Sequence, residues 1–202
     1  MAIEFKSADN YERFMGVWSR SAGELFIDWL APRKSLRWLD VGSGSGAFTK
    51  SIVQRCSPLS VCGIDPSKEL VEYAKETQDP NLCSFQVGSA TDLPFDENSF
   101  DLASMALVLF SISDPLTGVK EMRRVVVQGG LVAAYTWDVF GGGFPANGIQ
   151  EEMRLLGHSP ILPPSAEASR MAVMQEIWTK GGIAGVEVTQ IGIERQFSNF
   201  DE

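Results

Sequence analysis

The sequence has 202 residues, a length that suits one domain with a modest extension rather than two full domains. Hydrophobic residues make up 44% and charged residues 21%, which is ordinary for a globular protein and excludes collagen-like, coiled-coil and wholly disordered classes. The formal net charge of −9 disfavours nucleic acid as a partner, because an acidic chain repels a polyanion. The longest apolar stretch, residues 102–110, is too short for a membrane span.

Residues 35–137 alternate short apolar runs with amphipathic stretches, which predicts strand–helix–strand units. We therefore expect a single α/β domain with a doubly wound, mostly parallel, Rossmann-like sheet and helices on both faces. The predicted strands cover residues 36–41, 60–64, 83–87, 100–109 and 131–137. The predicted helices between them cover residues 48–53, 66–74 and 114–128, and Gly129 and Gly130 are expected to end the last of these.

Further elements are predicted on both sides of this region. Residues 1–33 carry aromatic and aliphatic side chains at helical intervals from Tyr11 to Leu30. Residues 138–165 are rich in glycine and proline and predict a lid with one short helix near residues 149–156. Residues 167–180 predict a helix, and residues 186–193 alternate like a sixth strand.

A glycine-rich loop follows the first predicted strand and leads into a helix. Residues 40–46 are Asp-Val-Gly-Ser-Gly-Ser-Gly, and glycine at such a turn permits positive φ and close approach of a ligand to the backbone. Asp65 ends the second predicted strand, about 20 residues further on, where a carboxylate can accept hydrogen bonds from ribose hydroxyls. The two features together predict a nucleoside-binding site at the strand ends.

The same loop leaves a dinucleotide-dependent oxidoreductase open as an alternative. Gly42, Gly44 and Ala47 satisfy the G-x-G-x-x-A pattern of nicotinamide and flavin enzymes. Asp40 disfavours that alternative, because its carboxylate precedes the first glycine by two residues, near the place of a pyrophosphate, and would suit a cationic ligand. A Tyr-x-x-x-Lys proton donor is also missing, since Thr77 stands where Tyr73 would need a lysine.

Four segments in order resemble class I S-adenosylmethionine-dependent methyltransferases of the small-molecule type, which includes the ubiquinone and menaquinone biosynthesis C-methyltransferases. The segments are residues 40–46, 88–95, 100–105 and 124–130, within a resemblance that covers residues 10–137. It implies S-adenosylmethionine as cofactor and S-adenosylhomocysteine as product. The implied cofactor contacts are Asp40, Gly42, Ser43 and Gly44 at the methionine part, Asp65 and Pro66 at the ribose, Ala90, Thr91 and Asp92 at the adenine, and Met105.

Residues 11–20 resemble the cofactor-covering helix of the same enzymes. The resemblance implies that Tyr11 and Trp18 close over the sulfonium, since aromatic faces attract cations, and that Arg20 meets the methionine carboxylate. An amphipathic helix that merely packs on the sheet, with Arg20 in solvent, remains an open alternative.

Methyl transfer from a sulfonium is an in-line displacement with an activated donor, so alignment of the reactants can supply most of the catalysis. No dedicated catalytic residue or metal is required. His158, in the predicted lid, is a weak candidate base for a hydroxyl or phenol acceptor, and a surface or spacer histidine is the preferred interpretation. Residues 105–109 with Phe140 and Phe144 would form an apolar wall, which indicates a small, partly hydrophobic acceptor.

Other sequence features bear on partners and location. The Asn-Pro-Pro-Tyr pattern of adenine and glutamine methylation is absent after Asp101, which again disfavours nucleic acid. The three cysteines show no C-x-x-C spacing and suit reduced thiols in the cytoplasm. The family's last antiparallel strand, which pairs with the fifth, has no counterpart, so we expect an incomplete sheet and a possible homodimer through its open edge. A cofactor-binding module, or a truncated form with little or no transferase activity, is the second functional hypothesis.

Overall fold

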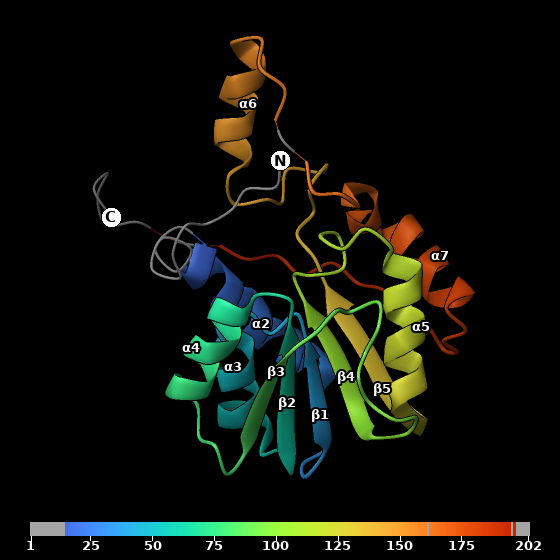
Figure 1. Ribbon diagram of the computed structural model, residues 1–202. Helices are drawn as coiled ribbons and strands as arrows, with labels where there is room; N and C mark the ends of the chain where they lie inside the picture. Colours follow the sequence, from blue (N-terminus) through green and yellow to red (C-terminus); the bar gives the residue numbers. More distant parts are fainter. Residues whose placement is uncertain (1–14, 161, 195, 197–202) are drawn as a thin grey trace.

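The computed structural model describes residues 15–160, 162–194 and 196. Its centre is a five-stranded parallel sheet with the order β3-β2-β1-β4-β5 (Figure 1). The strands are β1 Arg37–Val41, β2 Ser60–Asp65, β3 Cys83–Val87, β4 Phe100–Ala106 and β5 Val126–Tyr135. The parallel sheet predicted from the sequence is confirmed.

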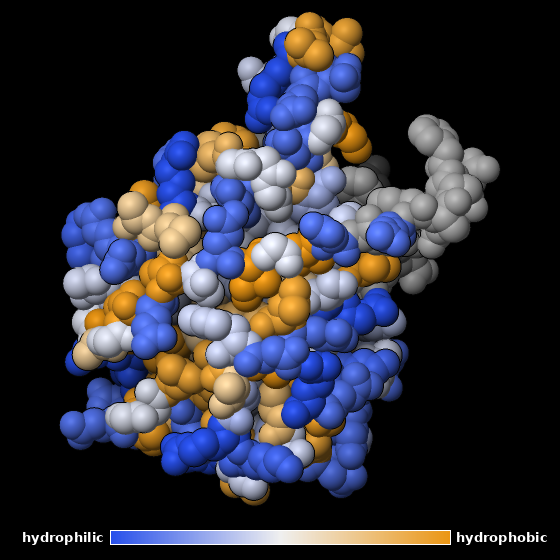
Figure 2. Space-filling model, turned by 180° about the vertical axis from the view of Figure 1, so that it is seen from behind, coloured by the Kyte–Doolittle hydropathy of each residue, from blue (hydrophilic) through white to orange (hydrophobic). Residues whose placement is uncertain are grey.

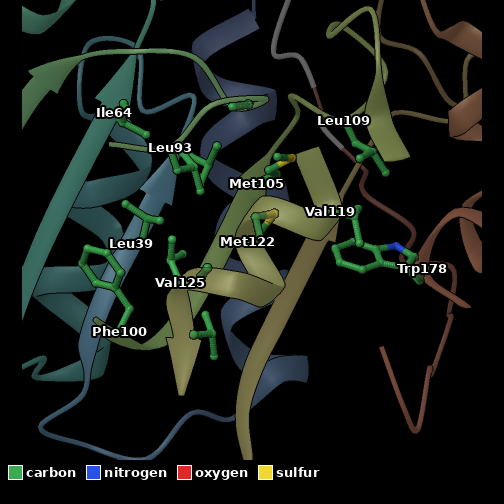
Figure 3. Close-up of a cluster of buried hydrophobic side chains, with 14 of the residues drawn as sticks. Leu39, Ile64, Leu93, Phe100, Met105, Leu109, Val119, Met122, Val125 and Trp178 are labelled. Atoms are coloured by element: carbon green, nitrogen blue, oxygen red, sulfur yellow. The ribbon is translucent and has the colours of Figure 1, made fainter. Parts of the chain in front are cut away.

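Helices cover both faces of the sheet, as expected for a doubly wound fold. On one face α2 (Val17–Leu30), α3 (Ala47–Cys56) and α4 (Lys68–Thr77) bury Ile27, Ile52 and Val71 against Trp38 and Leu102. On the other face lie α5 (Pro115–Val125) and α7 (Met171–Lys180). Their Val119, Met122 and Trp178 side chains pack with Leu39 and Met105 of the sheet (Figure 3).

Two of the predicted helix starts are confirmed by their capping bonds. The Ser67 hydroxyl accepts a hydrogen bond from the Leu70 amide at the start of α4, at 3.3 Å. The Asp114 carboxylate accepts one from the Thr117 amide at the start of α5, at 3.0 Å, and Pro115 occupies the first turn. Serine and aspartate are favoured at these positions because their side chains satisfy backbone amides that lack a partner inside the helix.

Gly129 and Gly130 lie inside β5 and do not end α5, so that sequence prediction is wrong. The β4–β5 register shifts between the pairs Phe100–Val126 and Leu102–Leu131, which leaves residues 127–130 as a bulge. Gly129 has a φ of +77°. A Cβ on Gly130 would lie 2.6 Å from the Asp101 carbonyl oxygen, so both positions suit glycine.

The predicted sixth strand, residues 186–193, lies outside the five-stranded sheet and is a second wrong prediction. The alternation exists, since Val186 and Val188 are half-buried while Glu187 and Thr189 are exposed. A strand, however, also requires ladder hydrogen bonds to a neighbour. The helix predicted over residues 167–180 is likewise interrupted: a 3-10 turn, η2 (Ala166–Ser169), precedes α7, with extended backbone at Arg170.

Within the predicted lid, α6 (Asn147–Leu155) stands away from the sheet (Figure 1). Ile149 on this helix is 56% exposed, and Leu155 and Leu156 at its end are 79% and 74% exposed. Figure 2 shows apolar surface at the outer end of this projection. Among the helices of the described residues, none has the length and apolarity that a bilayer crossing requires.

Candidate functional site

The carboxyl ends of the strands meet where the strand order reverses. From β1 the chain continues outward to β2 and β3 on one side, whereas β4 and β5 lie on the other, so the reversal falls between β1 and β4. Ligands of open α/β sheets bind in the crevice outside the carboxyl ends at this switch point. The glycine loop, residues 42–46, leaves β1 at that position.

The glycine loop is fixed by backbone bonds to the end of β2. The Gly42 and Ser43 amides both donate to the Ile64 carbonyl oxygen, at 2.7 and 3.0 Å. The Gly44 amide donates to Asp65 Oδ2 at 2.9 Å. The φ angles are +75° at Gly42 and +53° at Gly44, and both values favour glycine.

The two glycines face different surroundings. A Cβ on Gly42 would overlap the side chain of Val108, which lies just after β4 and packs over the loop. A Cβ on Gly44 would have no atom of the described residues within 4 Å. The open side of Gly44 is therefore where a ligand can approach the backbone.

Asp40, at the end of β1, is fully buried. Its Oδ2 accepts a hydrogen bond from the Thr49 hydroxyl at 2.7 Å, whereas its Oδ1 has no hydrogen-bond partner in the described part of the chain. Burial raises the pKa of Asp40 to about 7, the Thr49 bond opposes this shift, and the Asp65 charge adds to it. A buried carboxylate with a free oxygen favours a cationic or hydrogen-bond-donating ligand group.

Asp65, at the end of β2, is bonded through both carboxylate oxygens. Oδ2 binds the Gly44 amide, and Oδ1 accepts from the Ser67 amide at 2.9 Å. Burial raises the pKa of Asp65, and the two amide bonds oppose this shift. A carboxylate offers about four lone pairs, so Asp65 keeps acceptor capacity for ribose hydroxyls beside its structural bonds. The neighbouring Pro66 is exposed.

The loop after β3 begins beside Asp65, because the Gly88 amide donates to the Asp65 carbonyl oxygen at 3.1 Å. Within the loop the hydroxyls of Ser89 and Thr91 lie 2.9 Å apart. Ala90 is buried, Thr91 is half-buried and Asp92 is exposed. The structure thus brings Asp40, the glycine loop, Asp65 and residues 88–92 to one edge of the sheet.

The other predicted site residues belong to the core, to α2 and to the segment after α6. Met105 is fully buried and packs in the core cluster beneath α5 (Figure 3), and its contact with the cofactor stays a prediction. His158 is exposed and follows α6, which stands away from the sheet. Trp18 packs with an apolar cluster that includes Trp137, and Arg20 is exposed on α2. Tyr11 lies outside the described residues.

Sequence reasoning missed two residues that shape the site, Thr49 and Ser67. Thr49 orients Asp40, and its spacing with Ile52 and Cys56 on α3 was a readable signal, because a threonine on a buried stripe needs a polar partner. Ser67 binds Asp65 through its amide. Leu107, which belongs to the predicted apolar wall, has a φ of +62°, and this rare backbone conformation of a leucine has no sequence signal.

A groove of about 1590 Å³ lies along β5, away from the glycine loop. It is lined by β5, part of α2, residues 137–145 and residues 182–193. Trp18, Phe140 and Phe144 belong to this lining and also pack on the apolar cluster of Met15, Phe110 and Trp137. The groove therefore adjoins the aromatic wall predicted for the acceptor, and it also marks the open edge of the sheet.

Comparison with known proteins agrees with this geometry. Residues 39–134, close to half of the chain, match the family described as Methyltransferase domain. The stretch that carries the glycine loop, Asp65 and residues 88–92 is thus similar in sequence to a methyltransferase domain. A solved S-adenosylmethionine-dependent methyltransferase from Aquifex aeolicus, at 20% identity and a TM-score of 0.65, shares the fold over 92% of this chain and 88% of its own.

Two curated relatives match over a shorter stretch. An uncharacterized methyltransferase of Schizosaccharomyces pombe is 34% identical over 116 residues, which are 53% of this chain and 42% of the relative. A demethylmenaquinone methyltransferase of Staphylococcus aureus is 37% identical over 102 residues, 50% of this chain and 42% of the relative. The matched region thus spans less than half the length of these relatives.

Proposed function

We propose that this protein binds S-adenosylmethionine and directs its methyl group to a small, partly hydrophobic acceptor. The observation that carries the proposal is the buried Asp40 carboxylate, with one oxygen unpartnered among the described residues, next to a glycine loop at the switch point of the sheet. The match of residues 39–134 to a methyltransferase domain supports it.

The residues at the carboxyl edge fit this cofactor. When bound, S-adenosylmethionine supplies a methyl group already activated on a sulfonium. Asp40 would balance the positive charge of the methionine part, and the open side of Gly44 leaves room for it. Asp65 would accept hydrogen bonds from the ribose, and residues 90–92 would border the adenine.

The acceptor class is inferred from the aromatic wall beside the site. Trp18, Leu107, Phe140 and Phe144 pack partly buried around one apolar cluster. Apolar walls of this kind exclude water and align small hydrophobic substrates. We assign no role to His158, because its segment stands apart from the glycine loop.

A glycine pair tests cofactor binding. Gly44→Ala and Gly129→Ala each place a methyl group at a positive φ with no atom of the described residues within 4 Å, so each should cost roughly 1 to 2 kcal/mol of stability. Only Gly44 adjoins the proposed site. We expect S-adenosylhomocysteine affinity, measured by calorimetry, to fall at least tenfold in Gly44→Ala and to stay unchanged in Gly129→Ala. Equal affinity in both variants would remove the glycine loop from the site.

Turnover separates an enzyme from a binding module. We expect S-adenosylhomocysteine release from S-adenosylmethionine with at least one member of a panel of quinones, phenols and amines. Binding without release over the whole panel would instead favour the module.

We further propose a cytoplasmic protein that pairs with a second copy of itself. Cys56, Cys62 and Cys83 are free thiols whose pKa is raised by burial, which suits a reducing compartment. The edge strand β5 and the groove beside it support the pairing, because an open sheet edge offers unpaired backbone groups.

A further inference from the structure

Two charged side chains on α5 hold the loop that follows β3. Glu121 Oε2 accepts a hydrogen bond from the Leu93 amide at 2.9 Å. Arg124 donates to the Leu93 carbonyl oxygen at 2.9 Å and to the Phe95 carbonyl oxygen at 2.7 Å. The same guanidinium binds Glu121 through two bonds of 2.7 Å. The pair thus clamps both backbone groups of Leu93.

The clamp is protected and electrostatically matched. The side chains of Glu121 and Arg124 are 19% and 31% exposed, which favours charge-assisted bonds over solvation. The Arg124 guanidinium holds the pKa of Glu121 below its usual value. Hydrogen bonding to Glu121, and the charges of Glu97 and Asp92, raise the pKa of Arg124. Both clamp residues therefore remain ionised near neutral pH.

The clamp fixes only the far end of the loop, and a second contact fixes the near end. The Gly88 amide donates to the Asp65 carbonyl oxygen at 3.1 Å. The buried Leu93 side chain adds a hydrophobic anchor at the far end. Residues 89–92, which include the proposed adenine border of residues 90–92, thus lie between fixed points at Asp65 and α5, and a segment this short with fixed ends has few conformations.

We propose that Glu121 and Arg124 are positioning residues that preset residues 89–92 for the adenine of the cofactor, without touching the ligand themselves. The inference rests on the proposed function, because it takes these residues as the adenine border. Its physical basis is preorganisation: a loop already ordered before binding does not lose conformational freedom when the ligand arrives.

Arg124→Lys tests the clamp while it keeps the charge. A lysine ammonium cannot reproduce the planar fork that reaches Glu121 and two carbonyl oxygens at once. We expect the Kd for S-adenosylhomocysteine and the KM for S-adenosylmethionine to rise about tenfold, with kcat retained at saturating cofactor. Glu121→Gln, which keeps an acceptor for the Leu93 amide but loses the charge, should give a smaller rise in the same direction.

Arg37→Lys is the matched control. Arg37 forms a comparable fork on Asp101, with bonds of 2.8 and 3.0 Å, and lies at the start of β1, at the opposite end of the sheet. The Arg37→Lys variant should lose about as much stability as Arg124→Lys, and its cofactor affinity should equal that of the wild type. In Arg124→Lys, the affinity for 5′-methylthioadenosine, which lacks the amino acid part, should fall by the same factor as the affinity for S-adenosylhomocysteine.

Amide hydrogen exchange gives a readout without any ligand. In Arg124→Lys we expect faster exchange at Thr91, Asp92 and Leu93 than in Arg37→Lys, whereas the amides of Gly42 and Ser43 stay protected. If the wild type binds S-adenosylhomocysteine and Arg124→Lys binds it equally well, the inference is overturned and the proposed function stands. Failure of the wild type to bind S-adenosylhomocysteine would overturn both, and it would appear before any variant is made.

Discussion

Asp40 and Asp65 are buried carboxylates at the ends of adjacent strands, yet their surroundings differ. Asp65 has both oxygens bonded to backbone amides, whereas Asp40 has one bonded oxygen and one without a partner among the described residues. Burial raises the pKa of both groups, and it raises the pKa of Asp40 to about 7. In the ligand-free protein, Asp40 is therefore a destabilising charge at pH 8.

The pH dependence of stability should reveal this charge. The folded pKa of Asp40, about 7, exceeds its ordinary value of 3.8, so between these values the folded state holds more protons than the unfolded state. The contribution of Asp40 to the free energy of unfolding therefore falls as the pH rises from about 4 to 7, by at most about 1.4 kcal/mol per pH unit. Above about pH 7 this contribution is constant. We expect Asp40→Asn to remove this fall in urea titrations of the ligand-free protein at pH 5, 6, 7 and 8.

Asp114 provides a control of opposite sign. Its bonds to Thr117 lower its pKa, so its stabilising contribution is present above the ordinary carboxylate pKa and is lost as pH falls further. Asp114→Asn should leave the profile between pH 5 and 8 unchanged. If Asp40→Asn and Asp114→Asn have the same profile, Asp40 does not titrate in this range.

At this scale the sequence predicted chemistry better than orientation. Asp40, the glycines and Asp65 were identifiable because their roles depend on residue type and on position at a strand end. The face of the sheet on which Met105 lies follows from the alternation along β4, and the sequence alone does not tell which of the two faces that is. The neighbour of Met105 at two residues' distance, Ala103, lies in the same cluster beneath α5.

Among the elements, β5 shows that a pair of glycines after a helical stretch can either end the helix or form a bulge in the following strand. Glycines after a helical stretch usually mark the end of the helix, but here they form a bulge within the strand. The ends of the first four strands were predicted to within about three residues, since apolar runs in a parallel sheet are nearly continuous, whereas β5 begins at Val126, before the predicted start at residue 131. Residues 186–193 have the alternation of a strand but no place in the sheet, and pairing cannot be read from one segment alone.

The bulge predicts a large effect of a small side chain. In Gly130→Ala the new methyl group would lie 2.6 Å from the Asp101 carbonyl oxygen, which is part of β4 and cannot rotate away. We expect a loss of about 1 to 3 kcal/mol in the free energy of unfolding, measured by urea denaturation. A Gly130→Ala protein as stable as the wild type would show that the β4–β5 register adapts at little cost.

On the scale of the whole molecule, the carboxyl edge of the sheet is covered by loops and helices, whereas one side of the sheet ends in the edge strand β5. This edge strand lies beside a groove of about 1590 Å³. The strand β5 is rich in apolar residues, and one of them, Leu131, is 41% exposed. Such an edge either recruits another strand or needs protection from aggregation.

Light scattering tests the proposed pairing of two copies. The wild type should show a mass of about twice 22.1 kDa at high concentration and dissociate on dilution. Leu131→Lys should shift it to the monomer, because a charge on the edge strand opposes pairing. Leu59→Lys, at a 62% exposed site before β2, should not. A constant monomer mass for the wild type would exclude β5 as a self-association edge.

The bonds of Asp65 have one more consequence, which concerns side-chain length. Its two oxygens reach the Gly44 and Ser67 amides at 2.9 Å each, and these amides belong to the loop before α3 and to the turn between β2 and α4. A glutamate would carry the same charge one methylene further and would overshoot both. The reach of this single acid therefore sets the spacing between the first two crossover connections of the sheet.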